Sequence, residues 1–164
     1  MPNTLYIPSE NALQMPSDVA RALTNNVLGA YKHLKLPIGF ALPDAAVLFT
    51  VPTLPNGCAG LYIGRLWWEI TTSFTGGTTP AAGVNSSNAN YSTAGDLLGG
   101  SAGDLTATLV STGLKYKGGT LGTKFGSNGI VALLAGDTIK FNRIATPFFT
   151  AGAGFVHIDI GFVD

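Results

Sequence analysis

The stretch that decides the fold runs from Arg65 to Phe74 and reads Arg-Leu-Trp-Trp-Glu-Ile-Thr-Thr-Ser-Phe. Aromatic and β-branched residues favour a strand, and successive side chains of a strand point to opposite faces of its sheet. The alternation separates a mainly apolar face from a face that is polar apart from one tryptophan. The first face consists of Trp68, Ile70, Thr72 and Phe74, and the second of Trp67, Glu69, Thr71 and Ser73. We therefore expect the first face in the core and Trp67 against something else.

Three environments suit Trp67. A large aromatic residue on a polar face is typical of an interface hot spot, so contact with another subunit is one. The second is coverage by the chain's own N-terminal arm or long loop. The third is stacking on a sugar ring. The sequence leaves all three open.

The rest of the chain from Leu36 onward also indicates strands. Alternating or β-rich segments are separated by Gly-rich turns, which is typical of an antiparallel β-sandwich or jelly roll. We therefore predict an all-β domain over residues 36–164, in which any helix is confined to the N-terminal third of the chain. The expected core residues are Trp68, Ile70, Phe74, Leu105, Leu109, Ile139, Phe141, Val156, Ile158 and Ile160.

Residues 1–35 differ from this pattern and are predicted to form an arm. Pro2, Pro8 and Pro16 interrupt any regular element in the first half of the arm. Leu5, Tyr6 and Ile7 are apolar anchors that have no local partner. Residues 17–34 form either one short helix or an extended arm that lies on a neighbour.

A second segment, Thr75 to Gly103, is rich in Gly, Ser, Thr and Asn and carries one charge, Asp96. A loop of this length is uncommon inside a compact domain. The segment either holds a short strand around Ala82–Val84 or forms a functional or interface loop.

The composition limits the class of partner. The chain of 164 residues has 9 basic and 9 acidic residues, and charged residues make up 11% of it, against roughly 25% in an ordinary soluble domain. A net charge of zero gives no field that attracts nucleic acid or anionic lipid. The start of the chain lacks the features of a signal peptide, and no apolar run is long enough for a transmembrane helix. We expect a protein whose surface is largely covered by other protein.

Residues for chemistry are sparse. His157 and Asp159 are two apart in the last segment, so they share one strand face. They form either half of a metal site or part of a polar outer face, and the sequence shows no further ligands. No nucleophile elbow or phosphate-binding loop is present. We expect no enzyme activity and no cofactor.

Residues 45–163 resemble the small virion proteins of tailed bacteriophages that decorate or cement the icosahedral head. The resemblance rests on the aromatic strand, the long Gly/Ser/Asn segment, the Ala135-Gly136-Asp137 turn and the Gly-Ala-rich approach to the last strand. It implies a jelly-roll-like fold bound to the capsid exterior as a dimer or trimer, with the major capsid protein and further copies of the chain as partners. It also implies assembly in the cytoplasm of a bacterial host.

Contacts with the capsid protein or with other copies of the chain are expected from large apolar side chains and from Glu69 on the face of Trp67. A carbohydrate-binding or receptor-binding virion protein is the alternative, in which Trp67, Tyr91 or the Phe148-Phe149 pair would stack on sugars with Asn and Asp nearby. The interface candidates are Leu5, Tyr6, Ile7, Trp67, Glu69, Tyr91, Phe148 and Phe149.

Overall fold

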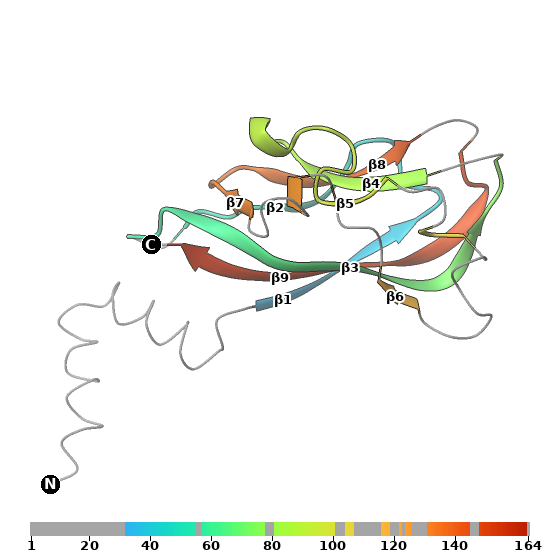
Figure 1. Cartoon of the computed structure of the whole chain (residues 1–164), viewed down its shortest axis with the longest axis horizontal. Helices are drawn as coiled ribbons and strands as arrows, with labels where there is room; N and C mark the ends of the chain where they lie inside the picture. Colours follow the sequence, from blue (N-terminus) through green and yellow to red (C-terminus); the bar gives the residue numbers. More distant parts are fainter. Residues whose placement is uncertain are drawn as a thin grey trace, which may run out of the picture.

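The computed structural model describes residues 32–54, 57–77, 81–100, 104–106, 116–118, 122, 124–125, 131–144 and 148–163. Within these residues the fold is almost entirely β (Figure 1). The elements are β1 (Lys32–Gly39), β2 (Ala46–Thr50), β3 (Gly60–Thr75), β4 (Ala81–Ser86), the 3-10 turn η1 (Ala89–Tyr91), β5 (Leu98–Gly99), β6 (Tyr116–Gly118), β7 (Val131–Leu133), β8 (Thr138–Ile144) and β9 (Ala151–Val163).

The strands of the described residues form two antiparallel sheets that pack face to face (Figure 1). The first sheet has the order β1-β9-β3-β6, and β7 also pairs with β3. The second sheet has the order β2-β8-β4-β5. β6 lies opposite Trp68–Ile70 and β7 lies opposite Leu61–Ile63, so both occupy the same position in the sheet beyond β3.

When β6 and β7 are counted as one interrupted strand, the described chain has eight strand positions in the orders 1-8-3-6 and 2-7-4-5. This is the strand order of a jelly roll, in which two Greek keys distribute eight strands over two four-stranded sheets. The predicted all-β class and antiparallel sandwich are confirmed.

The core lies between the two sheets. Trp68 of β3 and Phe141 of β8 meet edge to face, with ring centroids 6.4 Å apart, and thereby join the two layers. Gly99 of β5 permits this packing because a Cβ on it would stand 2.9 Å from the Trp68 ring and 2.5 Å from the Ala82 carbonyl oxygen. Leu109 lies outside the described residues, and the other expected core residues are buried: Trp68, Ile70, Phe74, Leu105, Ile139, Phe141, Val156, Ile158 and Ile160.

The prediction for Thr72 is wrong. It was assigned to the core face, but its side chain is exposed. The register of β3 against β9 shifts between Ile70 and Thr72 and again between Thr72 and Thr75. Each shift of this kind inserts an unpaired residue and reverses the alternation. Two shifts restore the original alternation at Phe74, which is buried, and leave Thr72 outside.

Two predicted boundaries change. β1 begins at Lys32, so residues 32–35 belong to the first sheet rather than to the arm, and the expected helix over 17–34 does not extend through Lys32–Leu34. The long segment from Thr75 to Gly103 holds β4 and β5, so the interpretation with a strand is confirmed. The remainder of the arm, with Leu5, Tyr6 and Ile7, lies outside the described residues.

We expect Trp68→Ala to lower the free energy of unfolding by about 3–5 kcal/mol, because the large side chain is fully buried and its removal leaves a cavity against Phe141. Urea denaturation followed by circular dichroism measures this. Thr72→Ala is the matched control on the same strand and should change the value by no more than about 0.5 kcal/mol. Equal losses for the two variants would contradict the assignment of the strand faces.

Candidate functional site

The outer face of the first sheet carries a cluster of charged and aromatic side chains from three adjacent strands. β1 places His33 opposite Asp159 and Lys35 opposite His157 of β9. On the other side of β9, Trp67 of β3 lies opposite His157. Directly opposed residues of antiparallel strands have Cβ atoms about 4.5–5.5 Å apart, so the pairing brings these side chains into contact. We call His33, Lys35, Glu69, His157 and Asp159 the histidine cluster.

A continuous series of short contacts runs through the histidine cluster. Asp159 Oδ1 lies 2.8 Å from His33 Nδ1, and His33 Nε2 lies 2.8 Å from His157 Nδ1. His157 Nε2 lies 2.5 Å from Glu69 Oε2, which is also 3.0 Å from Lys35 Nζ. The two histidine rings therefore join one carboxylate near the surface to one carboxylate in the interior.

Burial differs strongly along this series. Glu69 is 2% exposed and His157 is 5% exposed, whereas the His33 side chain is 45% exposed. Burial lowers the pKa of His157 below 6.5, against the opposing effects of the hydrogen bond and the negative charge of Glu69. The positive charges of His33 and Lys35 lower that pKa further. The structure therefore favours a neutral ring at His157.

Glu69 was an interface candidate, and this assignment is wrong for the folded chain. Its carboxylate is enclosed by its own sheet, where it contacts His157 and Lys35. A buried carboxylate needs such partners because the desolvation of an unpaired charge costs several kcal/mol. Glu69 therefore stabilises the first sheet and is not presented to another molecule.

Trp67 is half-buried by residues of its own chain. Its ring stacks on His157 with centroids 5.0 Å apart and planes at 7°, and on His33 with centroids 5.3 Å apart. The Arg65 guanidinium lies 5.0 Å from the Trp67 ring. The chain itself therefore covers part of the Trp67 ring, which was one of the three environments that the sequence left open. The covering residue His33 belongs to residues 1–35, which the sequence assigned to the arm.

The histidine cluster does not have the geometry of a metal centre. The described residues contain no group of three or more His, Cys, Asp or Glu side chains that is arranged to hold an ion. The two ring nitrogens that face each other are 2.8 Å apart. Two nitrogens at about 2.0–2.1 Å from a tetrahedral zinc ion lie farther apart than this, so the pair is not spaced for zinc. His157 and Asp159 lie on the same face of β9, as their spacing predicts, where His157 contacts Glu69 and Asp159 contacts His33.

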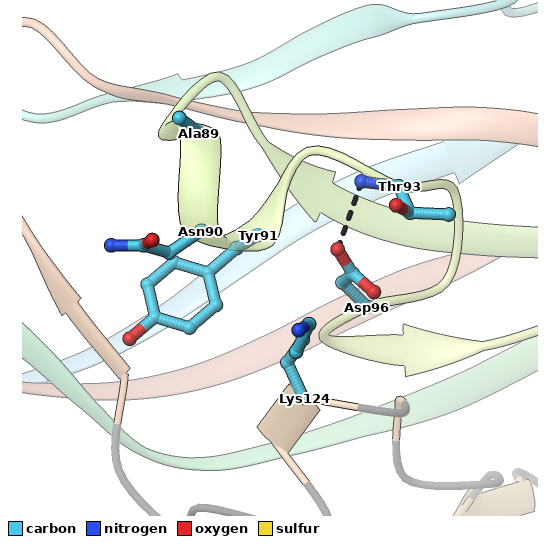
Figure 2. A pocket seen from close by; sticks show the side chains of 6 residues that line it. All are labelled: Ala89, Asn90, Tyr91, Thr93, Asp96 and Lys124. Atoms are coloured by element: carbon cyan, nitrogen blue, oxygen red, sulfur yellow. Dashed lines mark hydrogen bonds between the residues drawn. The ribbon is translucent and has the colours of Figure 1, made fainter.

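A pocket of about 460 Å³ lies beside η1 (Figure 2), and none of its lining residues belongs to the histidine cluster. The turn before it is fixed by Asn88, whose side-chain oxygen accepts a hydrogen bond from the Asn90 backbone N–H at 3.1 Å. The Asn88 amide also donates to Asp137 Oδ2 at 2.9 Å. The pocket is lined by Ala89, Asn90, Tyr91, Thr93, Asp96 and Lys124.

Asp96 organises this pocket. It is 4% exposed, and its Oδ2 accepts a hydrogen bond from the Thr93 backbone N–H at 2.8 Å (Figure 2). Its backbone carbonyl accepts from the N–H groups of Lys124 and Phe125 at 3.0 and 3.1 Å. These bonds bring Lys124 to the pocket although it is distant in sequence. Tyr91, a sequence candidate, is half-buried there with Asn90 and Asp96 nearby.

The two adjacent phenylalanines have different environments. Phe149 is 8% exposed and meets Phe74 edge to face at 5.0 Å, so it belongs to the core and its assignment to the interface is wrong. Phe148 is half-buried, and the Arg143 guanidinium lies 5.0 Å from its ring. Since adjacent residues at the approach to a strand point in different directions, one of the pair faces inward.

A third feature was not found in the sequence. Three large hydrophobic side chains of the described residues are exposed, from the ends of β1 and β7 and from β2: Phe40 at 44%, Val47 at 55% and Leu134 at 57%. Phe40 follows β1 directly, and Val47 lies in β2. Leu134 begins a turn that is bonded to Val51, just beyond β2. The Val51 N–H donates to the Asp137 carbonyl, and the Val51 carbonyl accepts from the Gly136 N–H. The alternation of side chains in residues 45–51 could have indicated that Val47 faces outward. The exposure of Phe40 and Leu134 follows only from the order of the strands.

Comparison with known proteins adds no relative. No protein-family model matches this chain, and no curated protein matches it either. Among the described residues, no helix has the length and apolar character needed to cross a membrane.

The contrast between Phe148 and Phe149 is testable. Phe149→Ala should lower the free energy of unfolding by about 3–5 kcal/mol, because it empties a site against Phe74. Phe148→Ala is its matched neighbour and should cost about 1 kcal/mol, since it loses a cation–π contact and partial burial. Thermal and urea unfolding measure both. A larger loss for Phe148→Ala would contradict the assignment.

Proposed function

We propose that this protein is a structural virion protein that binds the outside of an icosahedral phage head and stabilises it. The resemblance of residues 45–163 to decoration proteins suggests this role, and the jelly roll is a fold that recurs in viral capsid proteins. The proposed partners are the major capsid protein and further copies of the chain, in a dimer or trimer. A fold alone does not define a function, so the proposal depends on a surface suited to contact.

The observation that carries the proposal is the edge formed by β2. In the described residues β2 pairs with β8 alone, so its other side presents backbone N–H and C=O groups without a neighbouring strand. Natural sheets usually protect such an edge with charged residues, but the segment Ala46–Thr50 contains none. Val47, within this strand, adds an exposed apolar side chain. An edge of this kind suits the addition of a strand or an apolar surface from another subunit.

The charge of the chain fits the same role. With a net charge of zero, long-range attraction contributes little to the association with a capsid. The affinity must then come from apolar contacts and backbone hydrogen bonds. A specific interface buries about 1,200–2,000 Å² in total. Because an icosahedral head offers many equivalent sites, modest stabilisation at each site adds up over the shell.

The test is the decoration of purified undecorated heads. Wild-type protein should bind to saturation, and Val47→Lys should bind about 30-fold more weakly if this position is a hot spot, because it places a charge at the apolar edge. Titration of heads with fluorescently labelled protein measures this. The matched control is Thr72→Lys, an equal change at an exposed position of β3.

Both lysine variants should melt close to the wild type, since both positions are exposed. If Val47→Lys decorates heads like Thr72→Lys, the contact surface lies elsewhere on the protein. If the wild type does not bind heads at all, the proposed role itself is wrong.

The pocket beside η1 favours a second candidate, a carbohydrate-binding or receptor-binding virion protein. It combines the Tyr91 ring with the Asn90 amide, the Asp96 carboxylate and the Lys124 ammonium. Aromatic rings with a few fixed polar groups are typical of small-molecule sites, and a sugar offers both an apolar face and hydroxyl groups. The hydrogen bonds of Asn88 and Asp96 hold these groups in place before any ligand binds.

A screen of the protein against a panel of bacterial surface saccharides tests the second candidate. If it is correct, at least one saccharide binds, and Tyr91→Ala weakens that binding about 10-fold or more, because an aromatic contact is lost. Phe155→Ala is the control at a half-buried aromatic residue of β9 outside the pocket. Absence of binding across the panel, or equal effects of the two variants, would count against this function.

A further inference from the structure

The contacts of the histidine cluster fix the number of protons it must hold. Three short contacts connect four groups in series: Asp159 to His33, His33 to His157, and His157 to Glu69. Each contact of 2.5–2.8 Å between nitrogen or oxygen atoms requires one proton between the two atoms. Three contacts therefore require three protons.

Two neutral histidines and two carboxylates supply only two of these protons. An ionised carboxylate is only an acceptor, so His33 Nδ1 and His157 Nε2 must each carry a proton toward their carboxylate. In neutral rings the two nitrogens that face each other would then both be unprotonated, and their lone pairs would repel at 2.8 Å. We propose that His33 and His157 share one additional proton, so that the pair is a singly charged cation that fastens the edge strand β1 to the sheet.

The position of the shared proton follows from burial. His157 is enclosed and disfavours a charge, whereas the His33 side chain is 45% exposed and lies 2.8 Å from the Asp159 carboxylate. His33 therefore holds both ring protons, and its Nε2–H donates to His157 Nδ1. His157 remains neutral and donates its Nε2–H to Glu69.

The charges around the pair come from every strand that packs on it. β9 provides Asp159, and β3 provides Glu69 as well as Arg65, whose Nε lies 3.8 Å from Asp159 Oδ2. β1 provides Lys35, and β6 places Lys117 in register opposite Glu69. The two carboxylates stabilise the cationic pair, while Lys35 limits the uptake of a second proton.

The arrangement works in one protonation state only. If the shared proton leaves, the two facing nitrogens are both acceptors and the contact between β1 and β9 side chains is lost. If a second proton enters, both facing nitrogens become donors and repel each other in turn. β1 pairs with β9 alone among the described strands, and these side chains add to its backbone hydrogen bonds and to the packing of Leu34, Leu36 and Ile38 against the core.

The proposed shared proton makes the stability of the folded protein depend on pH. An unfolded histidine has a pKa of about 6.5. Above that value, release of the proposed shared proton removes a stabilising contact of the folded state, so stability falls as pH rises. Below it the unfolded chain binds a proton that buried His157 resists because its pKa is lowered, so stability falls as pH drops.

The first test observes the protons directly in the wild-type protein. The chain has two histidines, and both belong to the cluster, so their ring signals are readily assigned. Long-range ¹H–¹⁵N spectra near the reference pH of about 6.5 should show two protonated nitrogens on His33 and one, Nε2, on His157. Two singly protonated rings at that pH would overturn the proposal.

The second test follows thermal stability against pH. Between about pH 6.5 and about pH 8.5 the wild-type Tm should fall by roughly 2–4 °C, the shift expected when one such hydrogen bond is lost in a chain of this length. His33→Gln retains a donor and an acceptor without a titrating ring, and its Tm should stay level over that range. Lys32→Met, at an exposed position of β1 outside the histidine cluster, is the control that keeps the pair and should show the wild-type fall.

A wild-type Tm that does not change over this range would overturn the proposal, and so would an equal fall in His33→Gln. These outcomes are independent of capsid or saccharide binding, because they concern the protein alone.

Discussion

The structure depends on the pairing of β3 with β9 through the middle of the first sheet. β3 has 16 residues and β9 has 13, whereas strands usually have about 3–10. Two such long paired strands cannot stay regular while the sheet twists around a core. β-bulges let the strands bend and increase their local twist. The pairing is interrupted between Ile63 and Arg65 and twice after Ile70. The side chains that face the second sheet, and those that form the histidine cluster, are determined by where these interruptions fall.

Alternation in the sequence predicts the faces of β3 between the bulges and fails across them. Trp68 and Ile70 are buried as expected because no shift separates them. Before Gly64 the buried residues are Leu61 and Ile63, at odd positions, and after it they are Leu66 and Trp68, at even positions. A glycine inside a strand indicates a bulge, but the sequence does not tell which partner residue lies opposite it. Thr72 was misplaced for the same reason.

The site was less predictable than the fold because its parts are distant in sequence. The spacing of His157 and Asp159 shows that they share a face, yet His33 is 124 residues from His157 and meets it only through the pairing of β1 with β9. Glu69 was assigned to the correct face of β3 but not to the interior, since a polar face is usually solvated. The desolvation cost of burying the Glu69 carboxylate is offset by its contacts with His157 and Lys35. Tyr91 likewise required the docking of Lys124 before a pocket existed around it.

The distribution of charge indicates which surface remains available to another protein. The chain has few charged residues, and several of them are committed to the outer face of the first sheet, where they satisfy one another. A subunit that docked over the histidine cluster would have to remove water from the exposed side of His33 and Arg65, and the cluster offers few unpaired groups in return. Desolvation of charges that are already paired is unfavourable for binding. The edge at β2 has the opposite character, since its apolar side chains gain by burial and its backbone groups gain by pairing. Trp67 thus serves mainly the cohesion of its own sheet, and the edge near Val47 is the surface that better supports the proposed contact with another protein.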